Sequence, residues 1–221
     1  MIVAVDGPAG SGKGTVTKKI EEELGFLNLD TGATYRCVAL QTLREGVKIE
    51  NEDEIVRIAN DIDIKIDNTG NKDIILLNGE DVSKEIRTRE VTEIVSQVSS
   101  IIPVREKMVE VQRNLAKGKN VIVEGRDIGT VVFPNADIKI YLDASEEIRA
   151  KRRYEENKQN GIDTTYEEVL ENVKMRDYND MHKKVGALKK ADDAVVIDST
   201  ELSIEEVVEK IKELIKNTNN I

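Results

Sequence analysis

GPAGSGKGT, residues 7–15, is the stretch of sequence that decides the fold. It follows a short apolar run at residues 2–5 and precedes a helical pattern from Lys13 through Leu24, so it joins a strand to a helix. Its glycines allow the backbone to curl with successive N–H groups pointing inward, and the helix N-terminus adds partial positive charge. We therefore predict a loop that binds phosphate, in which Lys13 reaches the β- and γ-phosphates of a nucleotide.

The residue after Lys13 departs from the usual form of such a loop. The Walker A pattern has Ser or Thr directly after its lysine, whereas here Gly14 holds that position and the hydroxyl comes one residue later, at Thr15. We expect Mg²⁺ to arrive with the nucleotide, with Thr15 as its candidate protein ligand. The loop alone does not separate a kinase from a switch GTPase, a motor or a transporter ATPase, because all of them use it.

Composition and charge narrow the class of protein. The chain has 221 residues, which suits one domain with a substantial insert, and a net charge of −10 from 33 basic and 43 acidic residues. No apolar segment approaches the roughly 20 residues that span a bilayer, the N-terminus lacks a basic leader, and Cys37 has no second cysteine. We expect a cytoplasmic monomer that binds neither membranes nor nucleic acid.

The rest of the chain extends the strand–helix rhythm. Short apolar runs predict strands of a buried parallel sheet at residues 2–5, 121–123, 138–142 and 194–197. Helical patterns lie between them at residues 145–157, 165–182 and 204–216. Ser203 and Glu206 have the spacing of a capping box at the start of the last helix. An α/β fold is therefore predicted.

One region breaks this rhythm. Residues 62–66 alternate, residues 68–71 supply a turn and residues 74–77 begin a second β-rich run, which predicts a hairpin with a partly exposed face. Helical spacing follows at residues 91–98 and 104–116. We predict that about residues 60–110 form an insert.

Two further polar segments follow predicted core positions, LDTGATYR at residues 29–36 and VEGRDIGT at residues 123–130. In doubly wound sheets ligands bind beyond the carboxyl ends of the strands, so Arg36, Arg126 and Lys13 are expected to face one crevice. Three cations there indicate a ligand with several phosphates.

The basic run RAKRR at residues 149–153 has two interpretations. Acidic residues flank it at helical spacing, which is typical of a solvated helix face. Its position directly after a core strand favours instead a segment that closes over phosphates. His182 lies among polar residues and is predicted to be on the surface, whereas Cys37 is predicted to be a buried small side chain.

Several segments, taken together, resemble the bacterial cytidylate (CMP/dCMP) kinases, one family of the nucleoside monophosphate kinases. They are the loop ending in GKGT, then DTGATYR, EIRT, SQV, VRE, GRDIGTVVFP, KIYLDAS and VIDSTELSIEEV. Each segment is short, but their order is specific and the likeness covers nearly the whole chain.

The resemblance implies ATP-dependent, Mg²⁺-assisted phosphorylation of CMP and dCMP to CDP and dCDP. It also implies a five-stranded parallel sheet flanked by helices, with a small β-containing insert that binds the monophosphate and a helical lid. The chain would then be one kinase domain, with a core at residues 1–59, 111–148 and 188–221, the insert at about 60–110 and the lid at about 149–187.

The resemblance further implies roles for individual residues. ATP would be bound by Gly7, Pro8, Ala9, Gly10, Ser11, Gly12, Lys13, Gly14, Thr15, Arg149 and Arg153. CMP would be bound by Thr31, Tyr35, Arg36, Ser96, Arg105, Arg126, Asp127, Arg176 and Asp180. The catalytic residues would be Lys13, Arg126, Arg152 and Arg176, because phosphoryl transfer depends on positioning and charge neutralisation.

Ser96, Arg105 and Asp127 match the positions at which this family reads the base. Cytosine offers an N4 amino donor to Asp127, whereas uracil would place an acceptor against an acceptor. Two lid positions depart from the family: Lys183 stands in place of an arginine and Ala187 in place of a proline. Lysine keeps the charge but loses the planar fork.

Two rival functions remain at this point. One is another small-molecule kinase with the same loop, which the base-reading residues would distinguish. The other is a non-enzymatic nucleotide switch, which normally carries an N-K-x-D segment that reads guanine. The NKQN at residues 157–160 lacks the aspartate.

Overall fold

The computed structural model describes residues 1–67, 74–159 and 161–219. The chain divides into two compact units. The core unit comprises Met1–Asn28 and Lys119–Ile221, and the inserted unit comprises Leu29–Gly118. Within the described ranges, no helix is both long and apolar enough to span a membrane.

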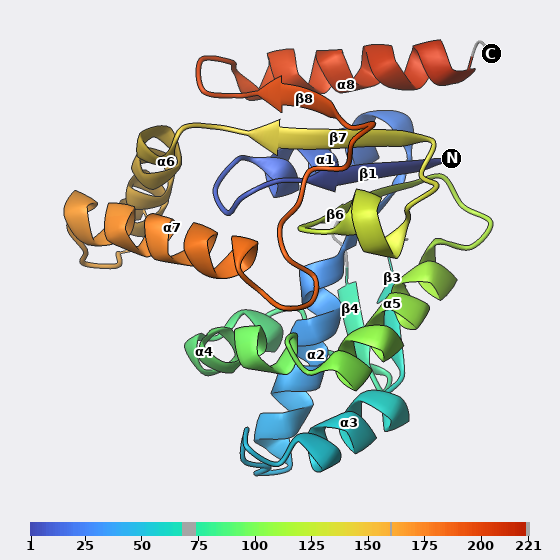
Figure 1. The fold of residues 1–221 in the computed structure, drawn as a ribbon, viewed down its shortest axis with the longest axis vertical. Coiled ribbons are helices and arrows are strands. Elements are labelled where there is room, and N and C mark those ends of the chain that lie inside the picture. Colours follow the sequence, from blue (N-terminus) through green and yellow to red (C-terminus); the bar gives the residue numbers. More distant parts are fainter. Residues whose placement is uncertain (68–73, 160, 220–221) are drawn as a thin grey trace. The chain divides into compact units, whose positions relative to one another are not determined.

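A five-stranded sheet forms the centre of the core unit (Figure 1). Its order is β2 (Leu27–Asp30), β6 (Val121–Gly125), β1 (Ile2–Asp6), β7 (Ile138–Asp143) and β8 (Val195–Asp198). Strand β1 pairs in parallel with β6 and β7, and β7 pairs in parallel with β8, while the last residues of β2 belong to the inserted unit. The predicted α/β fold with a five-stranded parallel sheet is confirmed.

Burial differs along this sheet. In β1, Val3 and Val5 are fully buried, as predicted for a central parallel strand. In β8, which lies at the sheet edge, Val195 is 43% exposed and Val196 is 51% exposed. The prediction of a buried strand at residues 194–197 was therefore right about the strand and about Ile197, which is buried, and wrong about Val195 and Val196, because apolar composition does not distinguish an edge strand from a central one.

Helices α1 (Lys13–Leu24) and α8 (Ile204–Asn219) pack on the sheet of the core unit. Their buried side chains include Ile20 of α1 and Ile211 of α8, which join Ile140 of β7 in one apolar cluster. Helix α8 begins with the predicted capping box: the Ser203 hydroxyl accepts the Glu206 N–H at 3.2 Å, and the Glu206 carboxylate accepts the Ser203 N–H at 2.8 Å. Helix α8 thus begins where its sequence predicts.

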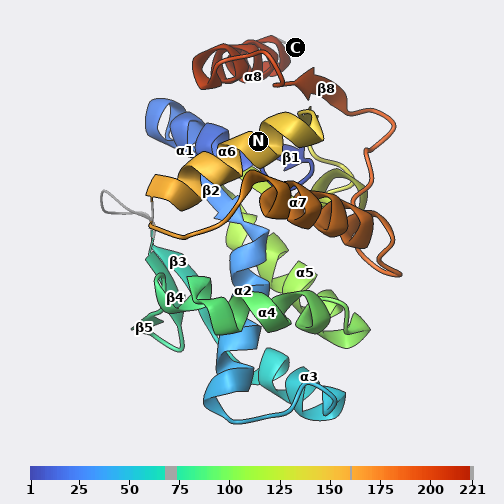
Figure 2. The same cartoon turned by 90° about the vertical axis from the view of Figure 1, so that its left-hand side faces the viewer.

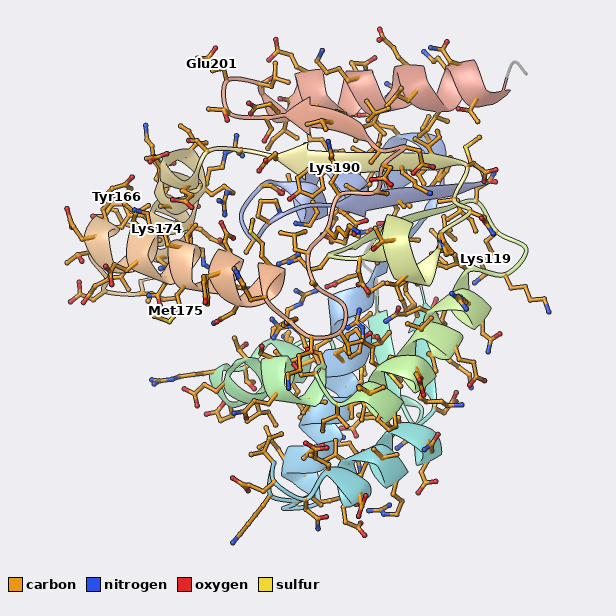
Figure 3. The ribbon with its side chains drawn as sticks, in the orientation of Figure 1. Lys119, Tyr166, Lys174, Met175, Lys190 and Glu201 are labelled. Atoms are coloured by element: carbon orange, nitrogen blue, oxygen red, sulfur yellow. The ribbon has the colours of Figure 1, made fainter. Side chains whose placement is uncertain are left out.

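Helices α6 (Glu146–Gln159) and α7 (Tyr166–Met181) follow β7 and lie side by side (Figure 2). A small apolar cluster of Ala150, Val169 and Val173 joins them. Tyr166, labelled in Figure 3, meets Tyr154 edge to face with ring centroids 6.3 Å apart. The pair therefore has its own small core, separate from that beneath α1 and α8.

The inserted unit has a second, antiparallel sheet of β3 (Ile64–Asp67), β4 (Ile74–Leu77) and β5 (Glu80–Asp81). The predicted hairpin is confirmed in its strands, its turn at residues 68–71 lies outside the described residues, and β5 was not predicted. The helices of the unit are α2 (Thr31–Arg44), α3 (Glu52–Asp61), α4 (Arg89–Val98) and α5 (Ile102–Ala116).

A separate apolar core holds the inserted unit together. It includes Val38 of α2, Ile55 of α3, Val91 of α4 and Met108 of α5, all fully buried. The predicted insert of about residues 60–110 lies within this unit, and the predicted boundaries of core, insert and lid stay predictions.

Candidate active site

The glycine-rich loop at residues 7–15 joins β1 to α1 in the core unit, as predicted. A Cβ on Gly7 would lie 2.0 Å from the carbonyl oxygen of Leu142, so a larger residue would clash with backbone. Gly12 precedes α1 with a φ of 94°, a left-handed conformation that favours glycine. The loop therefore ends at the N-terminal amides of a helix, where an anion is stabilised.

Lys13 is buried within this loop, with 5% of its surface exposed. Its Nζ donates to the carbonyl oxygens of Gly7 and Pro8, both at 2.8 Å. Burial and, after it, the charge of Arg126 lower the pKa of Lys13 to about 7, although Glu124 opposes this shift. A bound phosphate would supply the negative charge that favours the protonated lysine.

A cavity of about 860 Å³ adjoins the loop within the core unit. The loop, α6, α7 and the connection from β8 to α8 all line it. Of the predicted ATP-binding set, the lining includes Ala9, Gly10, Ser11, Gly12, Thr15, Arg149 and Arg153 but not Gly7, Pro8, Lys13 or Gly14. Arg152 and Arg176 also line it, so the structure brings all four predicted arginines of α6 and α7 to one cavity beside the loop.

Arg149 is almost fully buried, at 3% exposure. Its Nε donates to the Ala144 carbonyl at 2.9 Å, and its Nη1 donates to the Ala9 carbonyl at 3.1 Å. The same guanidinium forms a bidentate ion pair with Asp177 of α7, at 3.0 and 2.5 Å. Arg149 thus links α6, α7 and the phosphate loop, and the interpretation of residues 149–153 as a solvated face is wrong for this residue.

The two other arginines of this run lie differently. Arg152 donates to the carbonyl of Ser199 at 2.7 Å and to its hydroxyl at 3.2 Å, and burial lowers the pKa of Arg152. The Ser199 hydroxyl lies within hydrogen-bonding distance of two carbonyl oxygens, that of Asp143 at 3.0 Å and that of Ser11 at 3.2 Å. Arg153 is exposed and pairs with Glu156 at 2.9 Å.

Sequence reasoning did not select Asp177 or Ser199. Ser199 belongs to VIDST, part of one of the segments that resemble the family, and this likeness is a signal that could have identified Ser199. Asp177 follows Arg176 in a helix rich in charge, and no local signal marks it as the buried partner of a distant arginine.

A second ion-pair group joins residues predicted to bind CMP. Arg126 Nε donates to Asp180 Oδ2 at 2.8 Å, and Lys183 Nζ lies 3.4 Å from the other oxygen of Asp180. Burial acts to raise the pKa of Asp180, but Arg126 and Lys183 outweigh it and hold the pKa below its usual value. Lys183 therefore places a second cation beside Asp180 in this group. Asp127, next to Arg126, is buried at 5% exposure.

The remaining residues predicted to bind CMP lie in the inserted unit. Thr31, Tyr35 and Arg36 are on α2, Ser96 is on α4 and Arg105 is on α5. The Arg105 guanidinium lies over the Tyr35 ring, 5.5 Å from its centroid, and both residues are buried. This is a cation–π arrangement that fixes both side chains.

Arg36, the next residue of α2, is held by two acceptors within the inserted unit. Its Nη1 donates to the Ile86 carbonyl at 3.2 Å and to the Thr92 hydroxyl at 2.9 Å. Each unit thus contains part of the predicted set, and the shared crevice of Arg36, Arg126 and Lys13 stays a prediction.

The predictions for the two other reactive side chains are confirmed. Cys37 is fully buried, and burial raises its pKa to about 12. His182 is exposed, and its ring stacks on Tyr178 with centroids 4.1 Å apart. In the described part of the chain, no group of three or more His, Cys, Asp or Glu side chains is placed to hold a metal ion.

Comparison with known proteins places the chain in a family. The family model described as cytidylate kinase matches residues 3–217. The chain belongs to the cytidylate kinase family. A cytidylate kinase of Caldanaerobacter subterraneus is 50% identical over 217 residues, covering 98% of this chain and 95% of that protein. A cytidylate kinase of Caldicellulosiruptor bescii is 49% identical over 212 residues, covering 96% and 94%.

Solved structures support the fold. An uncharacterized protein from Eubacterium ventriosum has a TM-score of 0.53 at 12% identity, with 98% of each chain covered. Shikimate kinase from Bacteroides thetaiotaomicron has a TM-score of 0.50 at 12% identity, again with 98% of each chain covered. The cytidylate kinase family and these likenesses agree on a kinase-type α/β fold.

The lowered pKa of Lys13 predicts proton uptake when ATP binds. The lysine is partly deprotonated near pH 7 without nucleotide, and the phosphates would raise its pKa. Calorimetric titrations with ATP in buffers of different ionisation enthalpy would measure this uptake. At pH 7.5 we expect uptake of a fraction of one proton, and at pH 6 less, because Lys13 is then already mostly protonated. Uptake that Lys13→Met does not remove would contradict this assignment.

The buried pair of Arg149 and Asp177 predicts a large effect of Asp177→Asn. The substitution leaves a buried guanidinium without its counter-charge, so we expect a loss of about 3 kcal/mol in unfolding free energy and weaker ATP binding. Urea unfolding and calorimetry would measure both. The control is Glu209→Gln, which breaks an exposed pair with Lys212 and should cost under about 1 kcal/mol. Equal effects of the two variants would refute the role of the buried pair.

Proposed function

We propose that this chain transfers the γ-phosphoryl group of ATP to CMP and dCMP, giving ADP with CDP or dCDP. In this reaction the bond between the γ-phosphorus and the bridging oxygen of ADP breaks, and a bond forms to a phosphate oxygen of the monophosphate. Membership of the cytidylate kinase family supports the reaction. The observation that carries it in the structure is the cavity beside the phosphate loop, which all four arginines of α6 and α7 line.

In the core unit, the loop amides and Lys13 would bind the ATP phosphates. Arg152 and Arg176 would neutralise the charge that spreads over the transferring group, because both line the cavity beside the loop. Arg149 already donates to three protein acceptors, so it would hold the loop rather than bind ATP. The exposed Arg153 would bind ATP after giving up its ion pair with Glu156.

For CMP, we propose that Arg126 binds the phosphate and that Asp127 accepts a hydrogen bond from the cytosine amino group. Arg126 would exchange its bond to Asp180 for the phosphate, and its planar fork suits a phosphate oxygen pair. In the inserted unit, Arg36 would bind phosphate, Thr31 and Tyr35 would line the monophosphate site, and Ser96 and Arg105 would read the base. We further propose that the protein is a cytoplasmic monomer. Its net charge of −10 opposes self-association, and its single cysteine is typical of a reducing compartment.

The residues around the loop fit a magnesium ion carried by ATP. A Cβ on Gly14 would lie 3.2 Å from Glu124 Oε1, so a carboxylate stands where the usual serine or threonine would project. Carboxylate and hydroxyl oxygens are the ligands that Mg²⁺ prefers, and Glu124 with Thr15 would hold it. When bound, the ion neutralises charge on the β- and γ-phosphates. Glu124 was not among the residues selected from the sequence, although it stands in the quoted segment VEGRDIGT.

Removing this carboxylate is expected to weaken the effect of Mg²⁺ on ATP binding. In Glu124→Gln, we expect the gain in ATP affinity on adding Mg²⁺ to fall by about tenfold, because a charged ligand is lost. Calorimetry with and without Mg²⁺ measures this gain directly, without turnover. Glu155→Gln, which removes a charge from the wall of the cavity beside the loop, is the control. An unchanged gain in Glu124→Gln would exclude Glu124 as a ligand.

The first test of the proposed function is the formation of ADP from Mg-ATP with CMP, dCMP, UMP or AMP as acceptor. We expect turnover with CMP and dCMP and at least about 100-fold lower kcat/KM with UMP, because a buried acceptor would face an acceptor. UMP turnover equal to that of CMP would refute the base-reading role of Asp127. A folded protein that binds ATP and phosphorylates none of the four would point to another acceptor or to the switch.

A further inference from the structure

Asp6 is a buried carboxylate that the reaction as proposed does not use. It is the last residue of β1, directly before the phosphate loop, and only 4% of it is exposed. A phosphate-binding loop needs glycines and a lysine but no acidic residue at this position. The reason for Asp6 must therefore lie in what it contacts.

Both oxygens of Asp6 accept backbone hydrogen bonds from one turn. Oδ1 accepts the N–H of Ile128 at 2.7 Å, and Oδ2 accepts the N–H of Gly129 at 2.8 Å. These amides begin the short helical turn Ile128–Val132, which comes immediately after Arg126 and Asp127. Hydrogen bonds to an ionised acceptor are among the stronger ones in proteins, and two successive amides on one carboxylate fix the direction of the backbone.

The turn is built to allow this contact. A Cβ on Gly129 would lie 3.1 Å from the Lys139 side chain and 3.4 Å from Asp6 Oδ2, so glycine lets the turn pack closely against β7 beside the carboxylate. The carboxylate lies 122 residues away in sequence from the first amide that it accepts. The contact therefore fastens the segment containing Arg126 and Asp127 to the strand that carries the phosphate loop.

Stability alone does not favour this carboxylate. The pKa of Asp6 is raised to about 6, because burial outweighs the two amide bonds and the charge of Lys13, which lower it, and Asp127 adds to the rise. An acid whose pKa is higher in the folded than in the unfolded chain is less stable ionised in the fold, so the charge costs stability at neutral pH. A buried ionisable group that costs stability is a candidate for a functional role.

We propose that Asp6 is a positioning residue, which holds residues 126–129 in place and thereby sets the affinity of the enzyme for the pyrimidine monophosphate. This inference rests on the proposed function, in which Arg126 binds the CMP phosphate and Asp127 reads its base. Asp6 touches neither substrate and acts through the backbone that carries these two side chains.

Asp6→Asn tests the proposal. Asparagine keeps one acceptor oxygen and turns an NH₂ group toward a backbone N–H, so one of the two amides loses its partner. We expect the dissociation constant of CMP to rise about tenfold or more, with that of ATP changing less than about threefold. Calorimetry measures both constants. Hydrogen exchange of the amides of Ile128 and Gly129, followed by NMR, is expected to rise in the same variant.

Asp137→Asn is the matched control. Asp137 is an exposed aspartate that accepts the N–H of Ile2 at 2.6 Å, at the opposite end of β1. This variant also loses a carboxylate-to-amide bond, and it should leave both dissociation constants and the exchange of the two amides unchanged. If Asp6→Asn fails to fold, Gly129→Ala tests the same turn from the other side, because its methyl group would be crowded against the Lys139 side chain at 3.1 Å, directly beside Asp6 Oδ2.

Each outcome is decisive. Equal losses of CMP and ATP affinity, or faster exchange without any loss of CMP affinity, would overturn the positioning role. Unchanged exchange at Ile128 and Gly129 would overturn the contact itself. A wild-type protein that binds ATP but not CMP would instead refute the proposed function, and exchange in Asp6→Asn would then report on the contact independently of it.

Discussion

The burial of one ammonium group is the constraint on which the core unit depends. Lys13 is almost without water, and a lone buried charge is costly unless acceptors replace that water. The carbonyls of Gly7 and Pro8 supply these acceptors, which requires the tight curl that glycine permits. Carboxylates at Glu124 and Asp6 add negative charge, yet the pKa of Lys13 still falls to about 7. The loop is therefore an incompletely neutralised cation site, which a bound phosphate would complete.

Parallel strand pairing explains why these carboxylates are available. In the register of β1 and β6, Val5 lies beside Glu124 and Asp6 lies beside Gly125. Both strands thus end at the same edge of the sheet, directly where the phosphate loop begins. In an antiparallel pair, the end of β6 would lie at the opposite edge from the end of β1. The same pairing brings the segment after Gly125 close enough for Asp6 to hold its amides.

Features that depend on neighbouring residues could be predicted from the sequence, and those that depend on distant partners could not. The first strand, the loop and the helix ending at Leu24 follow from local patterning, and so does the capping box at Ser203. The family likeness supplied the fifth strand and the candidate residues. By contrast, the charge pattern of RAKRR fits a solvated helix face and a buried one equally well. The burial of Arg149 depends on Asp177, which lies 28 residues away in the sequence. The bonds from Asp6 to Ile128 and Gly129 are equally invisible in a single sequence.

The pair of helices α6 and α7 is attached to the loop by polar bonds. Its own apolar cluster is small, whereas Arg149 donates to the Ala9 carbonyl and Arg152 donates to Ser199, whose hydroxyl lies 3.2 Å from the Ser11 carbonyl. Arg149 also donates to Ala144 and Asp177, so it would keep its place when ATP binds. The acceptors of Arg152 on Ser199 are neutral, and a charged phosphate oxygen is a stronger acceptor for a guanidinium. In the proposed function, the helix pair would thus have one fixed link and one exchangeable link to the loop, as a lid over ATP requires.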